Sequence, residues 1–152
     1  MIINEKQKEL VQDLQSQEEL CIEKYKHYKA MARDEELQKL FGSIQENEQE
    51  HYDCLSQVLN GECPDIDTKD RAGMLYNPTP SYTGNFKQED KDFDKFLCTD
   101  CIATEKYVST VYNDDLFQFE DPHLRRLFGS IQTEEQNHAE MIYKYKAVNQ
   151  MN

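Results

Sequence analysis

The sequence has 152 residues, 17 of them Lys or Arg and 30 Asp or Glu, and a net charge of −13. This acidity disfavours nucleic acids and anionic membranes as partners. No apolar run is long enough to span a membrane. The N-terminus turns charged at Glu5 and lacks the apolar core of a signal peptide, so we expect the protein in the cytoplasm of the cell that makes it. The length fits one domain over residues 1–152.

The first half of the chain predicts two long helices. Residues 5–33 contain no Gly or Pro and are rich in Glu, Lys, Gln and Leu, which favours a helix. Asp34 is a typical N-cap for a second helix, and Asn60-Gly61 is a typical end. Apolar residues recur on this second helix at helical spacing, interrupted by Glu48 and His51.

Residues 61–88 break the helical pattern. Three of the four prolines and three of the five glycines fall there. A connection of this length is long enough to run the length of a helix, so we expect a crossover.

Two further helices are predicted in the second half. The third begins between Lys87 and Phe93 and ends between Asn113 and Phe119. Asp121-Pro122 then predicts an N-cap followed by Pro in the first turn of a fourth helix.

The two halves repeat one another. Leu-Phe-Gly-Ser-Ile-Gln occurs at 40–45 and 127–132, and Glu-x-x-His follows it each time. Glu23-Lys24-Tyr25 is similar to Glu105-Lys106-Tyr107, a match that requires five extra residues near 113–120 in the second copy. The sequence therefore predicts an all-α, antiparallel four-helix bundle of two duplicated hairpins, about 5–60 and 89–148, joined by a crossover over about 61–88.

The repeated Glu-x-x-His motif predicts a metal site. Three residues are nearly one helical turn, so each Glu and His project from the same, apolar face. Counting from the turns brings Glu23 level with Glu48, and Glu105 level with Glu135. Unpaired carboxylates in a core are costly, and two divalent cations would neutralise four of them. The predicted ligands are Glu23, Glu48, His51, Glu105, Glu135 and His138. Iron is the expected metal, with manganese or zinc as alternatives.

Several neighbouring residues admit more than one interpretation. The alternative for the whole set is a decayed site whose Glu and His side chains face solvent. Asn47 and Glu134 are placed to orient the two imidazoles. His27 is expected to be exposed or beside the site, and Tyr25 and Tyr107 to pack or to donate to it. The sequence allows three interpretations of the cysteines: buried or idle thiols, redox activity through a lone Cys-x-x-Cys, or oxidation within a cross-linked assembly. The cysteines are Cys21, Cys54, Cys63, Cys98 and Cys101.

Residues 20–147 resemble the ferritin-like superfamily, which includes rubrerythrins and bacterioferritins. The second half, from Thr104-Glu105-Lys106-Tyr107 to Glu134-Glu135-Gln136-Asn137-His138, resembles the Coat F family of spore coat proteins more particularly. Val108 stands where rubrerythrins have a further glutamate, and the paired Cys-x-x-Cys motifs of their rubredoxin module are absent.

The resemblance implies a di-iron or di-manganese protein with oxidase, peroxidase or ferroxidase chemistry toward dioxygen, peroxide or metal ions, deposited in the spore coat. A structural coat protein with a non-catalytic metal, or a metal-storage or delivery protein, is the alternative. A homodimer and other coat proteins are the expected protein partners.

Overall fold

The computed structural model describes residues 3–66 and 70–152, and within these ranges it contains helices and no strand. This confirms the all-α prediction. The elements are α1 (Glu5–Met31), α2 (Glu35–Leu59), the short α3 (Ala72–Leu75), α4 (Gln88–Asp115), a 3-10 turn (Leu116–Gln118) and α5 (Pro122–Val148). Part of the expected crossover, residues 67–69, lies outside the described residues.

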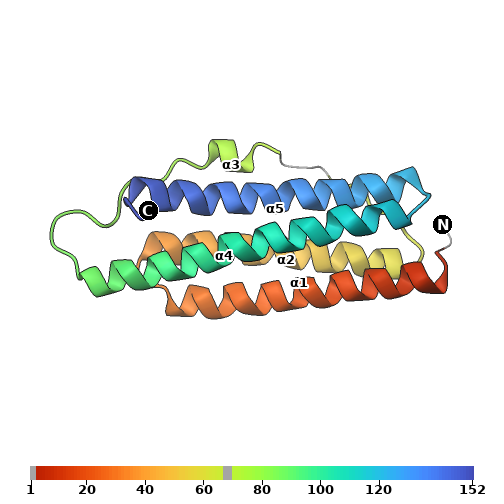
Figure 1. Cartoon of the computed structure of the whole chain (residues 1–152), viewed down its shortest axis with the longest axis horizontal. Helices are drawn as coiled ribbons and strands as arrows, with labels where there is room; N and C mark the ends of the chain where they lie inside the picture. The colour runs from red at the N-terminus through yellow and green to blue at the C-terminus, as the bar shows by residue number, and fades with distance from the viewer. Residues whose placement is uncertain (1–2, 67–69) are drawn as a thin grey trace.

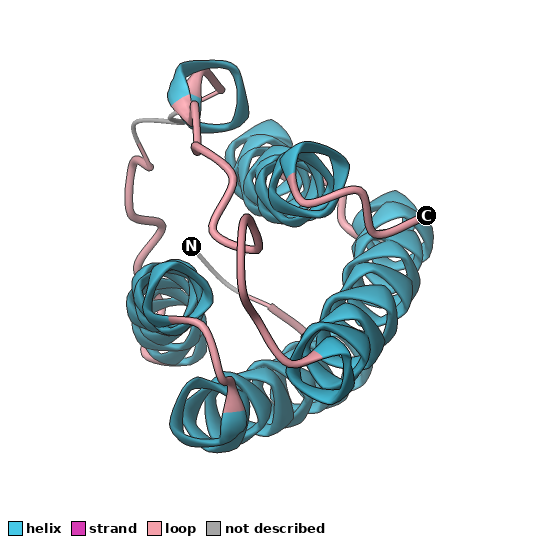
Figure 2. Ribbon diagram, turned by 90° about the vertical axis from the view of Figure 1, so that its left-hand side faces the viewer, coloured by secondary structure: helices cyan, strands magenta, loops and turns pink. Residues whose placement is uncertain are grey.

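The four long helices lie side by side as two antiparallel hairpins (Figure 1). The first hairpin pairs α1 with α2, and the second pairs α4 with α5. The described parts of the chain between α2 and α4 run back along the molecule, and α3 lies against α5. Seen end-on, the long helices surround a common centre (Figure 2).

Short polar residues fix where three of the four long helices begin, α1, α2 and α5. The Asn4 side chain accepts a hydrogen bond from the Gln7 backbone N–H, and the Gln7 side chain accepts one from Asn4 in return. Asp34 caps α2, and Asp121 caps α5 with Pro122 in the first turn, as predicted. Each cap satisfies a backbone donor that has no partner within its helix, which sets the register of the side chains that follow.

The short helix α3 was not predicted, and tertiary contacts hold it. The Gly73 N–H donates to Asn137 Oδ1 at 2.7 Å, and Lys144 Nζ donates to the Gly73 carbonyl at 2.6 Å. A Cβ at Gly73 would crowd the buried Asn137 Oδ1, to which the Gly73 N–H donates, whereas the half-exposed Glu140 side chain could turn away from it.

Buried apolar side chains form two separate clusters, one toward each end of the molecule. Leu55, Val58 and Phe128 belong to one, and Phe41, Ile44 and Ile142 belong to the other. Buried polar residues on all four long helices lie between the two clusters. In the described part of the chain, no helix combines the length and the apolarity needed to cross a membrane.

Candidate metal centre

Both Glu-x-x-His motifs lie on the inward faces of their helices. On α2, Glu48 is 0% exposed and His51 1%; on α5, Glu135 is 0% exposed and His138 2%. They continue the apolar stripes because three residues turn a helix by nearly one full revolution. The alternative of a decayed, solvent-facing site is therefore contradicted for these four residues.

The other two long helices contribute one buried glutamate each. Glu105 on α4 is 1% exposed, as predicted, and Glu18 on α1 is 0% exposed. We call the set of six buried side chains the carboxylate–histidine cluster; it consists of Glu18, Glu48, His51, Glu105, Glu135 and His138.

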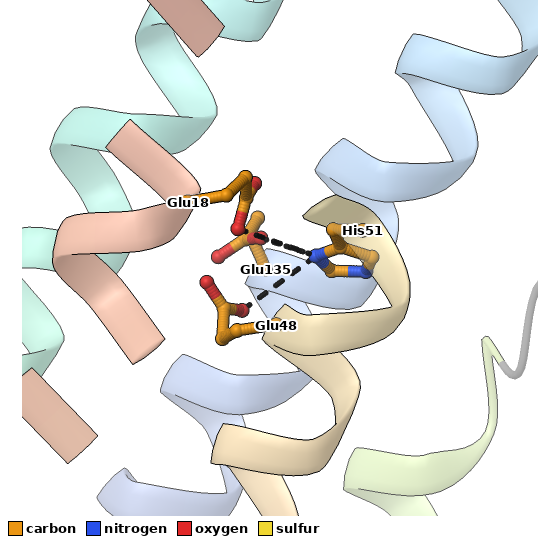
Figure 3. A group of neighbouring side chains, drawn as sticks. All are labelled: Glu18, Glu48, His51 and Glu135. Atoms are coloured by element: carbon orange, nitrogen blue, oxygen red, sulfur yellow. Dashed lines mark ion pairs between the residues drawn. The ribbon is translucent and has the colours of Figure 1, made fainter. Parts of the chain in front are cut away.

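The cluster divides into two groups, and each could hold a metal ion. The first comprises Glu18, Glu48, His51 and Glu135, with one potential ligand atom from each residue lying within 4.8 Å of the others. Figure 3 shows these side chains converging from α1, α2 and α5. The second group, by the same criterion, comprises Glu48, Glu105, Glu135 and His138. Glu48 and Glu135 belong to both groups, which is the arrangement that bridging carboxylates need.

Each histidine turns its Nδ1 atom toward the carboxylates. His51 Nδ1 lies 2.9 Å from Glu135 Oε1 and 3.6 Å from Glu48 Oε1. His138 Nδ1 lies 2.9 Å from Glu48 Oε1 and 3.4 Å from Glu105 Oε1. Nδ1 is therefore the atom that each imidazole would offer to a metal.

The outward Nε2 atoms are held by the residues that precede the two motifs. His51 Nε2 lies 2.9 Å from Glu134 Oε2, and His138 Nε2 lies 2.7 Å from Asn47 Oδ1. The prediction that Asn47 and Glu134 orient the imidazoles is confirmed. A proton on Nε2, donated to these oxygens, leaves Nδ1 with the lone pair that metal binding requires.

Within the described residues, the inward atoms of the cluster make no hydrogen bond of good geometry, although each Nδ1 lies 2.9 Å from a carboxylate oxygen. They include both oxygens of Glu48, both oxygens of Glu135 and the Nδ1 atoms of the two histidines. One carboxylate oxygen of Glu18 and one of Glu105 are also unpaired. Buried polar atoms without partners are rare and costly, so convergent unpaired lone pairs fit a divalent cation.

Burial and mutual repulsion perturb the titration of the metal-free cluster. Burial raises the pKa of Glu48 and of Glu105 well above the usual value, and the charge of Glu135 raises both further. Burial acts to lower the pKa of His51 and His138, but the surrounding carboxylates outweigh it and raise both. Burial also acts to raise the pKa of Glu135, but the neighbouring Glu105 carboxyl and the two histidines outweigh it and lower the pKa. Without a bound cation the cluster therefore retains protons, which a cation would displace on binding.

Two buried tyrosines cross-link the hairpins through the glutamates of α1 and α4. Tyr112 on α4 donates to Glu18 Oε1 at 2.6 Å, and Tyr25 on α1 donates to Glu105 Oε1 at 2.5 Å. The interpretation of Tyr25 as a donor to the site is thus confirmed for Glu105. Tyr107 is 65% exposed and does not reach the cluster.

The inward position predicted for Glu23 is wrong. Its side chain is 54% exposed and faces His27, which is 69% exposed. Glu18 takes its place, because the inward stripe of α1 is formed by Val11, Leu14, Glu18, Cys21 and Tyr25.

The repeat itself contained the signal for Glu18. Asn47 and Glu134 are 87 positions apart, and the same separation relates Glu48 to Glu135 and Glu18 to Glu105. It also relates Tyr25 to Tyr112, so the two halves match without the five-residue insertion. The similarity of Glu23-Lys24-Tyr25 to Glu105-Lys106-Tyr107 was a misleading local match.

The five cysteines are free thiols, and three of them are buried. Burial raises the pKa of Cys98 and of Cys101, so the Cys-x-x-Cys pair is held as neutral thiols. Burial and the carboxylates of the cluster do the same to Cys21, and the pKa of Cys54 and Cys63 is raised as well. This environment favours the prediction of buried or idle thiols over nucleophilic ones.

The second half of the chain resembles a known protein family. Residues 94–149 match the Coat F domain. This range covers Glu105 and the second Glu-x-x-His motif, and it agrees with the part of the sequence in which the Coat F resemblance was found. No curated protein and no solved structure gave a significant match.

Proposed function

We propose that this chain is a ferritin-like four-helix bundle, one domain over residues 1–152, that binds two divalent metal ions and uses them for oxidase-, peroxidase- or ferroxidase-type chemistry. Iron is the favoured metal, with manganese or zinc as alternatives. The observation that carries the proposal is the set of unpaired carboxylate and Nδ1 atoms converging in two groups from all four long helices. The Coat F match supports an association with the spore coat and with other coat proteins.

The chemistry of the donors fits two such ions. Four glutamates carry four negative charges, which two divalent cations would balance, and carboxylate with imidazole suits iron and manganese. Glu48 and Glu135 would be shared between the ions, while Glu18 and Glu105 would each serve one. Bound ions of this kind supply Lewis-acid and electron-transfer chemistry toward dioxygen or peroxide.

The chain's own residues hold this arrangement in place. The hydroxyls of Tyr112 and Tyr25 each fix one oxygen of Glu18 and Glu105 and leave the other oxygen unpaired. Glu134 and Asn47 set the rotation of the imidazoles. The ligand set is thus positioned before a metal arrives, which lowers the cost of binding.

A structural role for the metal is the second candidate, and one observation favours it. The cluster draws its six residues from α1, α2, α4 and α5, so a bound ion would tie both hairpins together. Such an ion would stabilise the fold without turnover.

Metal analysis tests the proposal most directly. Protein purified from iron- and manganese-replete cells is expected to contain about two ions per chain, and well under one per chain would refute the proposal. Glu18→Gln should lower the content, because it removes a charge and a ligand atom from one group. Glu23→Gln is the matched control: it makes the same chemical change on the same helix, but at an exposed position.

Turnover distinguishes the two candidates. If the centre is catalytic, Glu48→Ala should abolish consumption of peroxide or oxidation of Fe(II) while the helical circular dichroism remains. If the metal is structural, the wild type shows no turnover, and metal binding raises Tm strongly, corresponding to roughly 4 kcal/mol at a thousandfold excess over Kd.

A further inference from the structure

The two histidines of the cluster differ in what holds their outward nitrogen. His51 Nε2 faces the carboxylate of Glu134 at 2.9 Å, whereas His138 Nε2 faces the amide oxygen of Asn47 at 2.7 Å. Asn47 and Glu134 occupy equivalent positions in the two halves, 87 residues apart. The repeat is therefore broken at the one pair of residues that orients the imidazoles.

This difference changes the two histidines as ligands. A carboxylate that accepts the Nε2 proton makes the imidazole a more basic donor at Nδ1, and a neutral amide oxygen does so much less. The Glu134 side chain is only 7% exposed, so water screens its charge weakly. The metal-binding group that contains His51 thus has a stronger nitrogen ligand than the other group, and it has the negative charge of Glu134 nearby.

The group that contains His138 is the more accessible of the two from the surface. A cavity of about 200 Å³ between α2, α5 and α3 is lined by Asn47, Glu134 and His138. A second hollow, between α4 and α5, is lined by Glu105 and Glu135. Neither of these two hollows is lined by Glu18 or His51.

We propose that the two metal positions are unequal: the position formed by Glu18, Glu48, His51 and Glu135 binds a divalent cation first and more tightly, and the position beside His138 holds the later, exchangeable ion. This inference rests on the proposed function, in which the cluster binds two ions. Glu134 and Asn47 are positioning residues in this scheme, because they act through the histidines.

Titration of the metal-free full chain with Co²⁺, followed by calorimetry and absorption, tests the proposal. The wild type should bind two ions with affinities that differ about 10- to 100-fold, the usual effect of changing an outer partner of a histidine ligand. Glu134→Gln keeps the size of the side chain but removes its charge. It should weaken the tighter position about 10- to 100-fold and leave the weaker one nearly unchanged.

A double variant tests whether the order can be reversed. Asn47 also donates to Glu134 at 3.4 Å, so Asn47→Asp alone would place two carboxylates in contact. We therefore combine Asn47→Asp with Glu134→Gln, which exchanges the charged and neutral partners. With one equivalent of Co²⁺, anomalous diffraction should place the ion beside His51 in the wild type and beside His138 in the double variant. Tighter binding at the His138 position is a gain that a damaged fold would not produce.

The outcomes separate this inference from the function on which it rests. Two ions bound with equal affinity, or a first ion beside His138 in the wild type, would overturn the inequality and leave the two-metal proposal standing. A wild type that binds well under one Co²⁺ per chain would overturn both. Unchanged affinities in a folded Glu134→Gln variant would remove Glu134 from the explanation and refute the inference.

Discussion

Removal of metal should make the stability of this protein unusually sensitive to pH. Glu48, Glu105, His51 and His138 all have a pKa raised in the folded state, the first two chiefly by burial and the histidines by neighbouring carboxylates. Ordinary pKa values are about 4.3 for glutamate and about 6.5 for histidine. Above about pH 6.5 the metal-free folded chain therefore binds more protons than the unfolded chain, and its unfolding free energy falls as pH rises.

The size of this effect follows from the number of retained protons. Each additional proton in the folded state costs about 1.4 kcal/mol of stability per pH unit, so even one proton amounts to about 2.8 kcal/mol over two units. This is a large share of the roughly 5–15 kcal/mol that stabilises a typical domain. Glu135 has the opposite sign, because its lowered pKa contributes stability that is already complete above about pH 5.

Urea denaturation at about pH 6.5, 7.5 and 8.5, in chelator and with Mn²⁺, measures the slope. We expect a steep fall in chelator and a smaller dependence with metal, since the bound ion replaces the protons. Glu48→Gln should reduce the slope by up to about 1.4 kcal/mol per pH unit, whereas the exposed control Glu23→Gln should keep it. A metal-free protein whose stability stays level or rises between pH 6.5 and 8.5 would refute this reasoning.

Two further predictions concern the crossover and the thiols. Gly73→Ala should cost about 1 kcal/mol and speed proteolysis within residues 61–88, because its methyl group would crowd Asn137 Oδ1 and weaken the hydrogen bond that holds α3. Gly129→Ala is its control: a Cβ at Gly129 meets nothing within 4 Å, so the change should stabilise α5 by about 0.5–1 kcal/mol, and a loss of stability would contradict this account. Iodoacetamide followed by mass spectrometry should label the partly exposed Cys54 and Cys63 in the native protein. Iodoacetamide should not label the three buried thiols of the folded protein, which are Cys21, Cys98 and Cys101. Labelling of any of them before the protein unfolds would show that the core opens locally.

Local chemistry determined the helices, which is why they could be predicted from the sequence. The caps at Asp34 and Asp121 and the apolar spacing on α2 and α5 depend on residues close together in the chain. The helix α3 could not be found in this way, because its contacts with Asn137 and Lys144 lie more than 60 positions away.

The two Glu-x-x-His motifs were predicted correctly at their constant separation of 87 residues, whereas the glutamates of α1 and α4 were matched at a different separation and only Glu105 was correct. Both Glu-x-x-His motifs and Glu105 are buried in the cluster. Glu18 was missed because its neighbours in sequence do not resemble those of Glu105; only its distance of seven positions from Tyr25, equal to that of Glu105 from Tyr112, marks it. Burial against distant side chains, rather than local similarity, decided which glutamate of α1 faces inward.

The sharing of Glu48 and Glu135 has a consequence for how such a chain could arise. Each hairpin supplies three residues of one metal-binding group and takes the fourth from the other hairpin. One hairpin alone is therefore incomplete, but two identical copies related by a two-fold axis would complete each other. The constant separation of 87 residues fits the fusion of such a symmetric dimer into one chain. Covalent linkage then allowed the two halves to diverge, and Asn47 and Glu134 are a pair that a true dimer could not have made different.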